Sequence, residues 1–433
     1  MIRKILIVFF SIFAIGCVDE VDLSIVSNGT IEDILIVEAT LTDELKRHQV
    51  TLSKIDTILD LEIDSTFSPF TPNRNIDRDL VNYEENAQVT ISSGSGNQFT
   101  FLEISPGVYE SQMAFAAQVN DTYMLNIQTA NGKRFSSKDV KISGVSEIEN
   151  IYAERMTSEL GVEGVGIFID NNGINGDTQN FRFSYDETYK IIAPNWSSKK
   201  FKLTNYDPCA LPVTTYDLEI VDQEEETRVC YATVSSNTII QTQLPSPNDG
   251  VEKFLVRFLG NDNFAISHRY SIEISQMVSS SESYGFYENL NNFSQNGNVF
   301  SQVQPGFLEG NLSADDGSTG AVIGFFDVVS ISKERLFFNY TDFYPNEDLP
   351  PFPFNCTLLS SPESHVSYCS SGPSLGNPCP QSIIEQVNLG LITYVGNNEA
   401  IIGACPGPYV YVSRICGDCT NLGSNVVPEF WEE

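Results

Sequence analysis

A serine motif late in the chain is the first residue pattern that suggests chemistry. Residues 372–376 read G-P-S-L-G and match G-x-S-x-G, with which α/β-hydrolases place a nucleophilic serine at a sharp strand-to-helix turn. Here a proline adjoins Ser374, cysteines lie on both sides, and the chain lacks the alternating strands and helices that such a turn needs. We therefore interpret the motif as part of a disulfide-rich loop and predict no catalytic residue. A surface hydrolase is the less favoured alternative.

The histidines give little support for catalysis or metal binding. The three of them, His48, His268 and His365, lie in different segments, and none stands at the spacing of a metal-ligand pair. A single histidine is more often a surface or packing residue. The sequence therefore predicts neither a metal centre nor a histidine-dependent active site.

An oxygen-rich segment at Asp170–Asp177 resembles a calcium-binding loop. An EF-hand loop that began at Asp170 would need ligands at its fifth and twelfth positions, where Ile174 and Phe181 stand instead. The Asn-Gly pairs in this segment favour the positive φ of a tight turn between strands. We expect a β-turn here and no cofactor, with calcium binding as the alternative.

The first residues read as a lipoprotein signal. Arg3 and Lys4 precede an apolar run over residues 5–15, which is too short for a membrane span of ~20 residues. The run leads into A-I-G-C, which resembles the bacterial lipobox, where the cysteine takes a diacylglycerol and becomes the new N-terminus. We predict residues 1–16 as a signal peptide and Cys17 as the lipidation site. An ordinary signal peptide with a chance cysteine is the alternative.

The other eight cysteines predict disulfide bonds, because an even number in an exported chain is typical of a disulfide framework. Cys416 and Cys419 form a C-x-x-C, but zinc sites usually need a second such pair, and redox sites need a strand-to-helix turn. Neither context is present, so structural disulfides are favoured over zinc or redox use, and the pairing stays open. The candidates are Cys209, Cys230, Cys356, Cys369, Cys379, Cys405, Cys416 and Cys419.

Aromatic residues gather around a proline-rich loop between residues 337 and 354. Phe352 and Phe354 stand in the sequence P-P-F-P-F, and such rings in a loop act as partner anchors or glycan platforms. Packing of the loop on its own domain is the commoner alternative. We predict Phe352 and Phe354 as partner-binding residues.

Short alternating segments must position these residues. Apolar and polar side chains alternate over 49–53, 87–92, 98–102 and 122–128, with turn residues between them, which favours a β-sandwich. Between residues 279 and 296 the apolar residues recur at helical spacing, at Tyr284, Tyr287, Leu290 and Phe293.

From these patterns we expect a mostly β protein. Residues 17–30 form a lipidated acidic tether, and residues 31–144 form an immunoglobulin-like β-sandwich. Residues 145–433 form a larger β-rich domain with one helix and a disulfide-stapled C-terminal segment.

The charge of the chain excludes one class of partner. Its 57 acidic and 24 basic residues give a formal net charge of −33, which repels the phosphates of DNA and RNA. We therefore predict no nucleic-acid binding. The 41% content of hydrophobic residues is that of a folded protein.

The C-terminal sequence resembles a family of Bacteroidota lipoproteins. The segment Arg414–Ser424 with its C-G-D-C, followed by P-E-F-W at 428–431, is similar to the end of the family known as domain of unknown function 4249. Weaker similarities occur at Val37–Thr42, Pro106–Tyr109, Tyr123–Leu125, Gln304-Pro305, Gly310-Asn311 and Gly324–Phe326.

This resemblance implies a role rather than an activity. Members of the family are outer-membrane lipoproteins, often encoded beside TonB-dependent transporters, and no catalytic residues carry over. The resemblance implies a non-enzymatic accessory of such a barrel, with a cell-surface adhesive or structural module as the alternative. Asp19, Glu20 and Asp22 resemble the signal for surface display, and residues 56–58 and 64–66 resemble an O-glycosylation acceptor.

Overall fold

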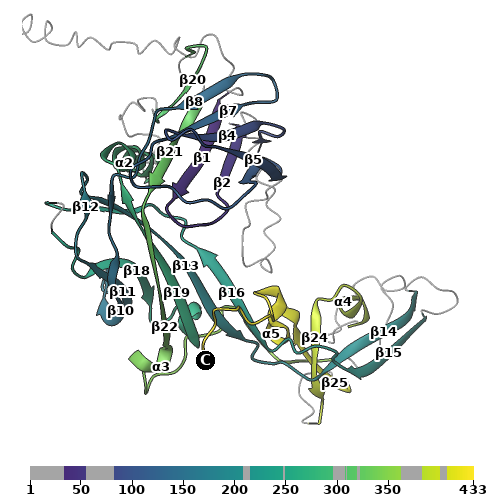
Figure 1. Cartoon of the computed structure of the whole chain (residues 1–433). Coiled ribbons are helices and arrows are strands. Elements are labelled where there is room, and N and C mark those ends of the chain that lie inside the picture. Colours follow the sequence, from purple (N-terminus) through teal and green to yellow (C-terminus); the bar gives the residue numbers. More distant parts are fainter. Residues whose placement is uncertain are drawn as a thin grey trace, which may run out of the picture.

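The computed structural model describes most of the chain after residue 33. The predicted signal peptide, Cys17, the tether, the serine motif, His365 and the two glycosylation patterns lie outside the described residues. The described part is mostly β, as expected (Figure 1). Within it, no helix combines the length and the apolar composition needed to cross a membrane. The described residues are 34–54, 82–207, 215–246, 249–295, 308, 310–318, 322–361, 383–399 and 407–433.

The first sheet, which we call the first module, contains ten strands around one core. Its hydrogen-bonded order is β20-β8-β7-β4-β5-β6-β2-β1-β21, with β3 paired to β2. Side chains of a strand alternate between its two faces, so Leu35, Val37, Ala39 and Leu41 of β1 all enter this core. The strands are β1 (Leu35–Thr42), β2 (Gln49–Lys54), β3 (Asn82–Tyr83), β4 (Gln88–Ser93), β5 (Gln98–Ser105), β6 (Val108–Ser111), β7 (Tyr123–Gln128), β8 (Arg134–Ser137), β20 (Leu312–Ala314) and β21 (Val322–Val329).

Strands from late in the chain complete the first module. The expected sandwich spans residues 31–144, whereas β20 and β21 come after residue 311. β21 pairs with β1 in parallel, and β20 pairs with β8 at the other end of the sheet. Leu312 and Phe326, from these two end strands, belong to one core cluster, so the sheet folds over until its ends meet. A local alternation pattern cannot reveal strand pairing over such a separation in sequence.

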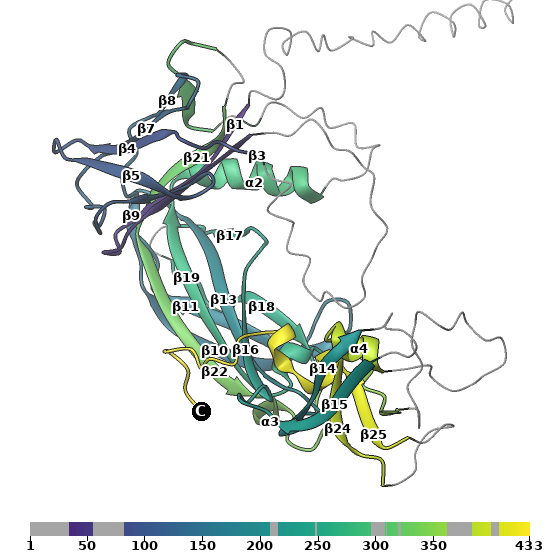
Figure 2. The same ribbon diagram turned by 90° about the vertical axis from the view of Figure 1, so that its right-hand side faces the viewer.

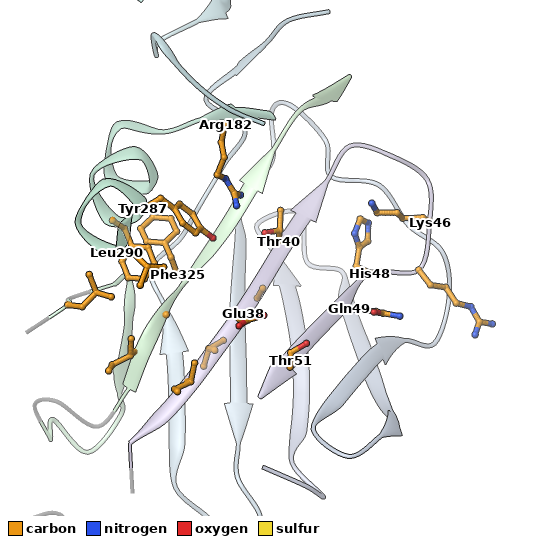
Figure 3. A pocket seen from close by; sticks show the side chains of 18 residues that line it. Glu38, Thr40, Lys46, His48, Gln49, Thr51, Arg182, Tyr287, Leu290 and Phe325 are labelled. Atoms are coloured by element: carbon orange, nitrogen blue, oxygen red, sulfur yellow. The ribbon is translucent and has the colours of Figure 1, made fainter. Parts of the chain in front are cut away.

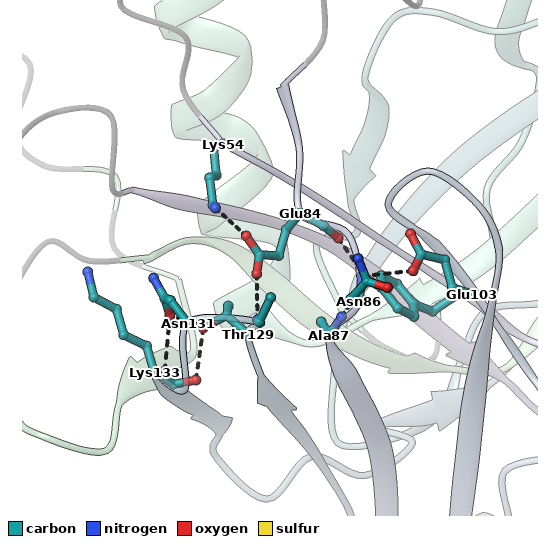
Figure 4. A network of polar contacts seen from close by, with 10 residues as sticks. Lys54, Glu84, Asn86, Ala87, Glu103, Thr129, Asn131 and Lys133 are labelled. Carbon is teal, nitrogen blue, oxygen red and sulfur yellow. Dashed lines mark hydrogen bonds and ion pairs between the residues drawn. The ribbon is translucent and has the colours of Figure 1, made fainter.

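A buried carboxylate fixes the loops at one end of the first module. Glu84 forms an ion pair with Lys54 and accepts the N–H of Ala130 at 2.9 Å (Figure 4). The hydroxyl of Tyr109 donates to the carbonyl of Glu84 at 2.7 Å and accepts the N–H of Ala87 at 2.9 Å. These bonds hold the segment before β4 against β2, β6 and the turn after β7.

The second module consists of two sheets on a second core. A three-stranded sheet, β10-β11-β18, and a five-stranded sheet, β16-β13-β19-β22 with β17 on β13, both bury apolar side chains in one cluster. The elements are β9 (Gly144–Val145), β10 (Ile148–Thr157), β11 (Glu163–Asn171), β12 (Asn175–Gly176), β13 (Asn180–Ile192), β16 (Val229–Ser235), β17 (Ile240–Gln243), β18 (Phe254–Gly260), η4 (Phe264–Ile266), β19 (Arg269–Ser279), β22 (Ile331–Asn339) and α3 (Tyr340–Phe343).

A direct strand connection and a helix are among the elements that join the two modules. Only Ser330, which is buried, separates β21 of the first module from β22 of the second. Helix α2 (Ser281–Gln295) follows β19 and lies at the junction (Figure 2). The hydroxyl of Ser280 accepts the N–H of Ser283 at 3.0 Å and so caps the helix. The helix predicted between residues 279 and 296 is confirmed, and it lies where the modules meet.

A third part, the arm, projects from the second module (Figure 1). The ring of Phe201 in its β14–β15 hairpin meets the rings of Tyr394 and Tyr409 edge-on, with centroids 5.4 and 5.7 Å apart. These contacts attach the hairpin to the three-stranded sheet β23-β25-β24. The elements are β14 (Lys199–Asp207), β15 (Thr215–Asp222), β23 (Leu359–Ser360), α4 (Ile384–Asn388), β24 (Ile392–Asn397), β25 (Tyr409–Ser413), α5 (Arg414–Gly417) and η5 (Cys419–Asn421).

Candidate functional site

Four of the eight candidate cysteines form two disulfide bonds. Cys419 bonds to Cys230 of β16, and Cys416 bonds to Cys356. The two cysteines of the C-x-x-C therefore have different partners, and neither is a free thiol for redox exchange or zinc binding. The first bond ties the C-terminal segment to the second module, and the second lies in the core of the arm. Cys209, Cys369, Cys379 and Cys405 lie outside the described residues.

Phe352 and Phe354 pack against the cores around these disulfides. Phe352 contacts both cores and meets the ring of Phe264 edge-on, with centroids 5.2 Å apart. Phe354 packs against the core that contains Cys416. Both rings are partly buried. This is the arrangement expected if the aromatic loop packs on its own domain.

The two described histidines are held by packing. His48 is buried, and its Nε2 lies 2.9 Å from the carbonyl oxygen of Phe115. Burial lowers the pKa of His48 and of His268, which favours the neutral imidazole at neutral pH. Within the described ranges, no group of three or more His, Cys, Asp or Glu side chains is arranged to hold a metal ion.

The oxygen-rich segment after β11 uses its side chains to build a turn. Asn171 Oδ1 accepts the N–H of Gly173 at 3.1 Å and that of Val251 at 3.0 Å. Asp170 Oδ1 accepts the N–H of Lys253 at 2.7 Å. Gly173 has a φ of 90°, as a tight turn requires. Asp170 and Asn171 line a cavity of about 540 Å³, but their oxygens serve the turn that was expected here.

A cavity of about 790 Å³ opens between α2 and the outer face of the first module (Figure 3). Its floor is formed by side chains of β1, β2 and β21 that alternate with core residues and so point away from the core. Tyr287 and Leu290 of α2, with Arg182 of β13, form the wall on the helix side. Both modules therefore contribute residues to this cavity, which is our candidate site.

Aromatic rings form much of the helix-side wall. The rings of Phe286 and Phe325 lie 5.5 Å apart between centroids and hold α2 on β21. The guanidinium of Arg182 stacks on the ring of Tyr287, 4.1 Å from its centroid. Such stacking is an attractive cation–π contact, strongest where water is excluded. The wall is thus assembled from three elements, β13, α2 and β21, through contacts among their own side chains.

A buried ionic network lies beneath the helix. Asp327 of β21 is 1% exposed, and its Oδ2 accepts the hydroxyl of Ser283 at 2.6 Å and a guanidinium N–H of Arg182 at 3.3 Å. Burial raises the pKa of Asp327, and Arg182 and Ser283 offset part of this rise. Asp327 belongs to the first module, Ser283 to α2 and Arg182 to the second module, so this network fixes their relative positions.

The floor of the cavity is more polar. Glu38 is exposed there, directly opposite Thr51 of β2 and next to Phe325 of β21 in the strand registers. At the far end of the floor, Lys46 pairs with Glu44 at 2.9 Å and Arg47 with Glu110 at 3.3 Å. Among the described residues, Glu38 is the charged lining residue for which no ion pair is formed.

Sequence reasoning found only part of this site. Tyr287 and Leu290 belong to the predicted helical stripe and line the cavity. Phe286, which is not part of that stripe, also lines the cavity and is buried. Arg182 and Asp327 were missed. Asp327 has a recognisable signal, because it is a single charge inside the apolar run of β21, and a buried charge needs a partner.

A comparison with known families gives one match. The family described as "Domain of unknown function (DUF4249)" matches residues 18–335. This range includes the first module, the second module as far as residue 335 within β22, and all the residues of the cavity. No curated protein matches the chain.

Proposed function

Because the chain belongs to the DUF4249 family, we propose that it is a non-enzymatic binding lipoprotein of the outer membrane, displayed at the cell surface. In this proposal it is an accessory component of a TonB-dependent transporter system. The lipobox at Cys17 supports the anchor, and the resemblance of the C-terminal sequence supports the transporter partnership. The binding activity is assigned to the cavity between α2 and the first module.

The observation that carries the binding proposal is a cavity whose walls are held by contacts among their own residues. Its volume of about 790 Å³ falls in the range of ~300–1,000 Å³ that is usual for ligand pockets. Apolar and aromatic side chains dominate the helix side, and a few polar groups stand on the floor, which is the usual composition of a binding pocket. The buried network of Asp327 holds the walls in place, so little ordering is needed on binding.

The position of the chain on a membrane can be tested with one substitution. Wild-type protein should incorporate a palmitate analogue, and Cys17→Ala should abolish the labelling and release the protein from membranes. The control is Cys356→Ala, which removes a cysteine from the arm but not from the lipobox. Labelling that persists in Cys17→Ala would exclude this anchor.

The partnership can be tested by purification of the tagged full-length protein from outer membranes in mild detergent. A TonB-dependent barrel should be enriched relative to an unrelated tagged lipoprotein of the same abundance. Absence of any barrel would exclude the transporter role and favour the adhesive or structural alternative. Labelling of the native protein by a fluorophosphonate probe would instead favour the hydrolase alternative.

A further inference from the structure

We infer that the cavity between α2 and the first module binds an organic cation with an apolar stem, the chemistry of a lysine or arginine side chain. This inference rests on the proposed function, because it names the ligand class of the same cavity. It follows from three features of the lining: the pairing of its charges, the position of its rings, and the charge of the whole chain.

The charges of the lining favour a cation. Each lysine and arginine side chain that lines the cavity already has an acidic partner: Arg182 pairs with Asp327, Lys46 with Glu44 and Arg47 with Glu110. Glu38 forms no ion pair within the part of the chain that the structure describes. A bound ammonium or guanidinium group would therefore complete the charge balance of the site through a charge-assisted hydrogen bond to this carboxylate.

The surroundings of Glu38 are apolar enough to contact the methylene stem of a lysine or arginine side chain. Phe325 stands next to Glu38 across the β1–β21 pair, and Ile323 of the same strand also lines the cavity. Methylene groups of a lysine or arginine stem would cover this apolar surface, while the charged end reaches Glu38. The Arg182–Tyr287 stack shows that a guanidinium already packs on a ring in this wall.

An anion is disfavoured by the same features. An anionic ligand would face the carboxylate of Glu38 and would have to displace Asp327 from Arg182, which is largely buried. The chain as a whole carries a formal charge of −33, and such a field raises the local concentration of cations and repels anions. Charge complementarity therefore selects a basic ligand.

The experiment uses the purified full-length protein in detergent and small probes in calorimetric titrations. Nα-acetyl-lysine methylamide carries the cation, and Nα-acetyl-norleucine methylamide has a similar stem without it. We expect the lysine probe to bind about threefold to fivefold more tightly than the norleucine probe, the upper range for an ion pair at an exposed carboxylate. A Gly-Lys-Gly peptide is the third probe. If this peptide binds more tightly than the lysine probe, the natural ligand is a basic side chain of a peptide segment. If the two bind equally, the natural ligand is a small free molecule.

Two matched variants locate the binding site. Glu38→Gln should weaken binding of the lysine probe about threefold to fivefold and leave binding of the norleucine probe unchanged, because only the cation contacts the carboxylate. Glu149→Gln removes the same charge from an exposed residue at the other described cavity, so it controls for the overall field and should change neither affinity.

Equal affinity for the lysine and norleucine probes, no binding of any probe, or an unchanged lysine affinity in Glu38→Gln would each overturn the inference. The transporter proposal is tested separately by enrichment of a barrel from membranes. Failure of the probes with a barrel still enriched would reject only the ligand class. Failure of both would reject the proposed function as well.

Discussion

The side chain of Asn311 and the backbone of Phe326 exchange two hydrogen bonds, with Asn311 Nδ2 donating at 2.7 Å and Oδ1 accepting at 2.8 Å. Asn311 precedes β20 and Phe326 lies in β21, so this amide takes the place of a neighbouring strand where the two ends of the first sheet meet. Gly310 allows the close approach, because a Cβ there would lie 1.6 Å from the carbonyl oxygen of Gly324. Two motifs that resemble the family, Gly310-Asn311 and Gly324–Phe326, are therefore in contact.

Asn311→Leu should destabilise the first module strongly. The substitution leaves the buried N–H and C=O of Phe326 without partners, and each unpaired group costs about 1–3 kcal/mol. We expect the free energy of unfolding to fall by about 2–5 kcal/mol in urea titrations. Asn97→Ala, which removes an exposed amide from a turn, is the control and should cost less than about 0.5 kcal/mol. Similar losses in the two variants would contradict the closing role of Asn311.

The buried ion pair of Arg182 and Asp327 beneath α2 predicts that the effects of their substitutions on the free energy of unfolding are not additive. Arg182→Met leaves the Asp327 carboxylate buried without its cation, which typically costs about 3–5 kcal/mol. The double variant Arg182→Met/Asp327→Asn removes the charge as well, so most of this loss should be recovered. Urea unfolding of both single variants and of the double variant measures the coupling. Additive losses would show that the two side chains do not act as a pair.

Glu44 predicts an acid-sensitive contact between the modules. It lies two residues after β1 of the first module and accepts hydrogen bonds from Lys333 of β22, at 2.8 and 2.9 Å, and from Lys46 at 2.9 Å. Partial burial raises the pKa of Glu44, but the two lysines outweigh this effect and lower it to about 2. A carboxyl whose pKa is lowered in the folded state stabilises that state above its ordinary pKa, near 4.5.

The stabilisation by Glu44 should therefore be lost as the pH falls from about 4.5 to about 2. The measurement compares unfolding of the wild-type protein with that of Glu44→Gln between pH 7 and pH 2. The wild type should be more stable at pH 7, and the difference should vanish near pH 2. Because Glu44 is more than one third exposed, solvent screening keeps this difference small. A difference that does not depend on pH would refute the pairing.

The Cys230–Cys419 bond predicts a large effect on the C-terminal segment. It closes a loop over a sequence separation of 189, and loss of a native disulfide typically costs about 2–5 kcal/mol. The double variant Cys230→Ala/Cys419→Ala should melt at a lower temperature than the wild type. Peptide mapping of the unreduced protein should find Cys416 and Cys419 on different partners. A Cys416–Cys419 bond in that map would overturn the assignment.

Phe352→Ala decides between packing and partner contact. The ring is partly buried against both disulfide cores. Loss of a fully buried phenylalanine costs about 3–5 kcal/mol, so we expect a smaller decrease in the free energy of unfolding, of about 1–3 kcal/mol. Barrel enrichment from membranes should stay unchanged. Normal melting with lost enrichment would instead restore the role as a partner anchor.

Much of the fold could be predicted from local sequence. The alternation in β1, β2, β4 and β7 gives their buried faces directly, because side-chain direction in a strand has a period of two. The helix was predictable because its cap and its periodicity agree. Both signals depend only on neighbours along the chain.

The candidate site could not be predicted as a whole, because its parts come from distant segments. Arg182 and Asp327 are 145 residues apart in sequence, and each is meaningful only beside the other. The closure by β20 and β21 has the same cause, since these strands follow the whole second module up to α2. Helical spacing indicates that apolar residues such as Tyr287 and Leu290 share one face of α2. It does not indicate whether that face packs on a core or lines a cavity.

The parallel pairing of β1 with β21 has a mechanical consequence. With the chain held at its N-terminus, a pull applied to β22 acts on β21 from its C-terminal end, while β1 is held at the opposite end. The two strands are then loaded lengthwise in opposite directions, and the eight residue pairs between Leu35–Val322 and Thr42–Val329 bear the load together. Under this load the hydrogen bonds between β1 and β21 must break together. In a hairpin pulled apart at its open end, by contrast, the hydrogen bonds break one pair at a time.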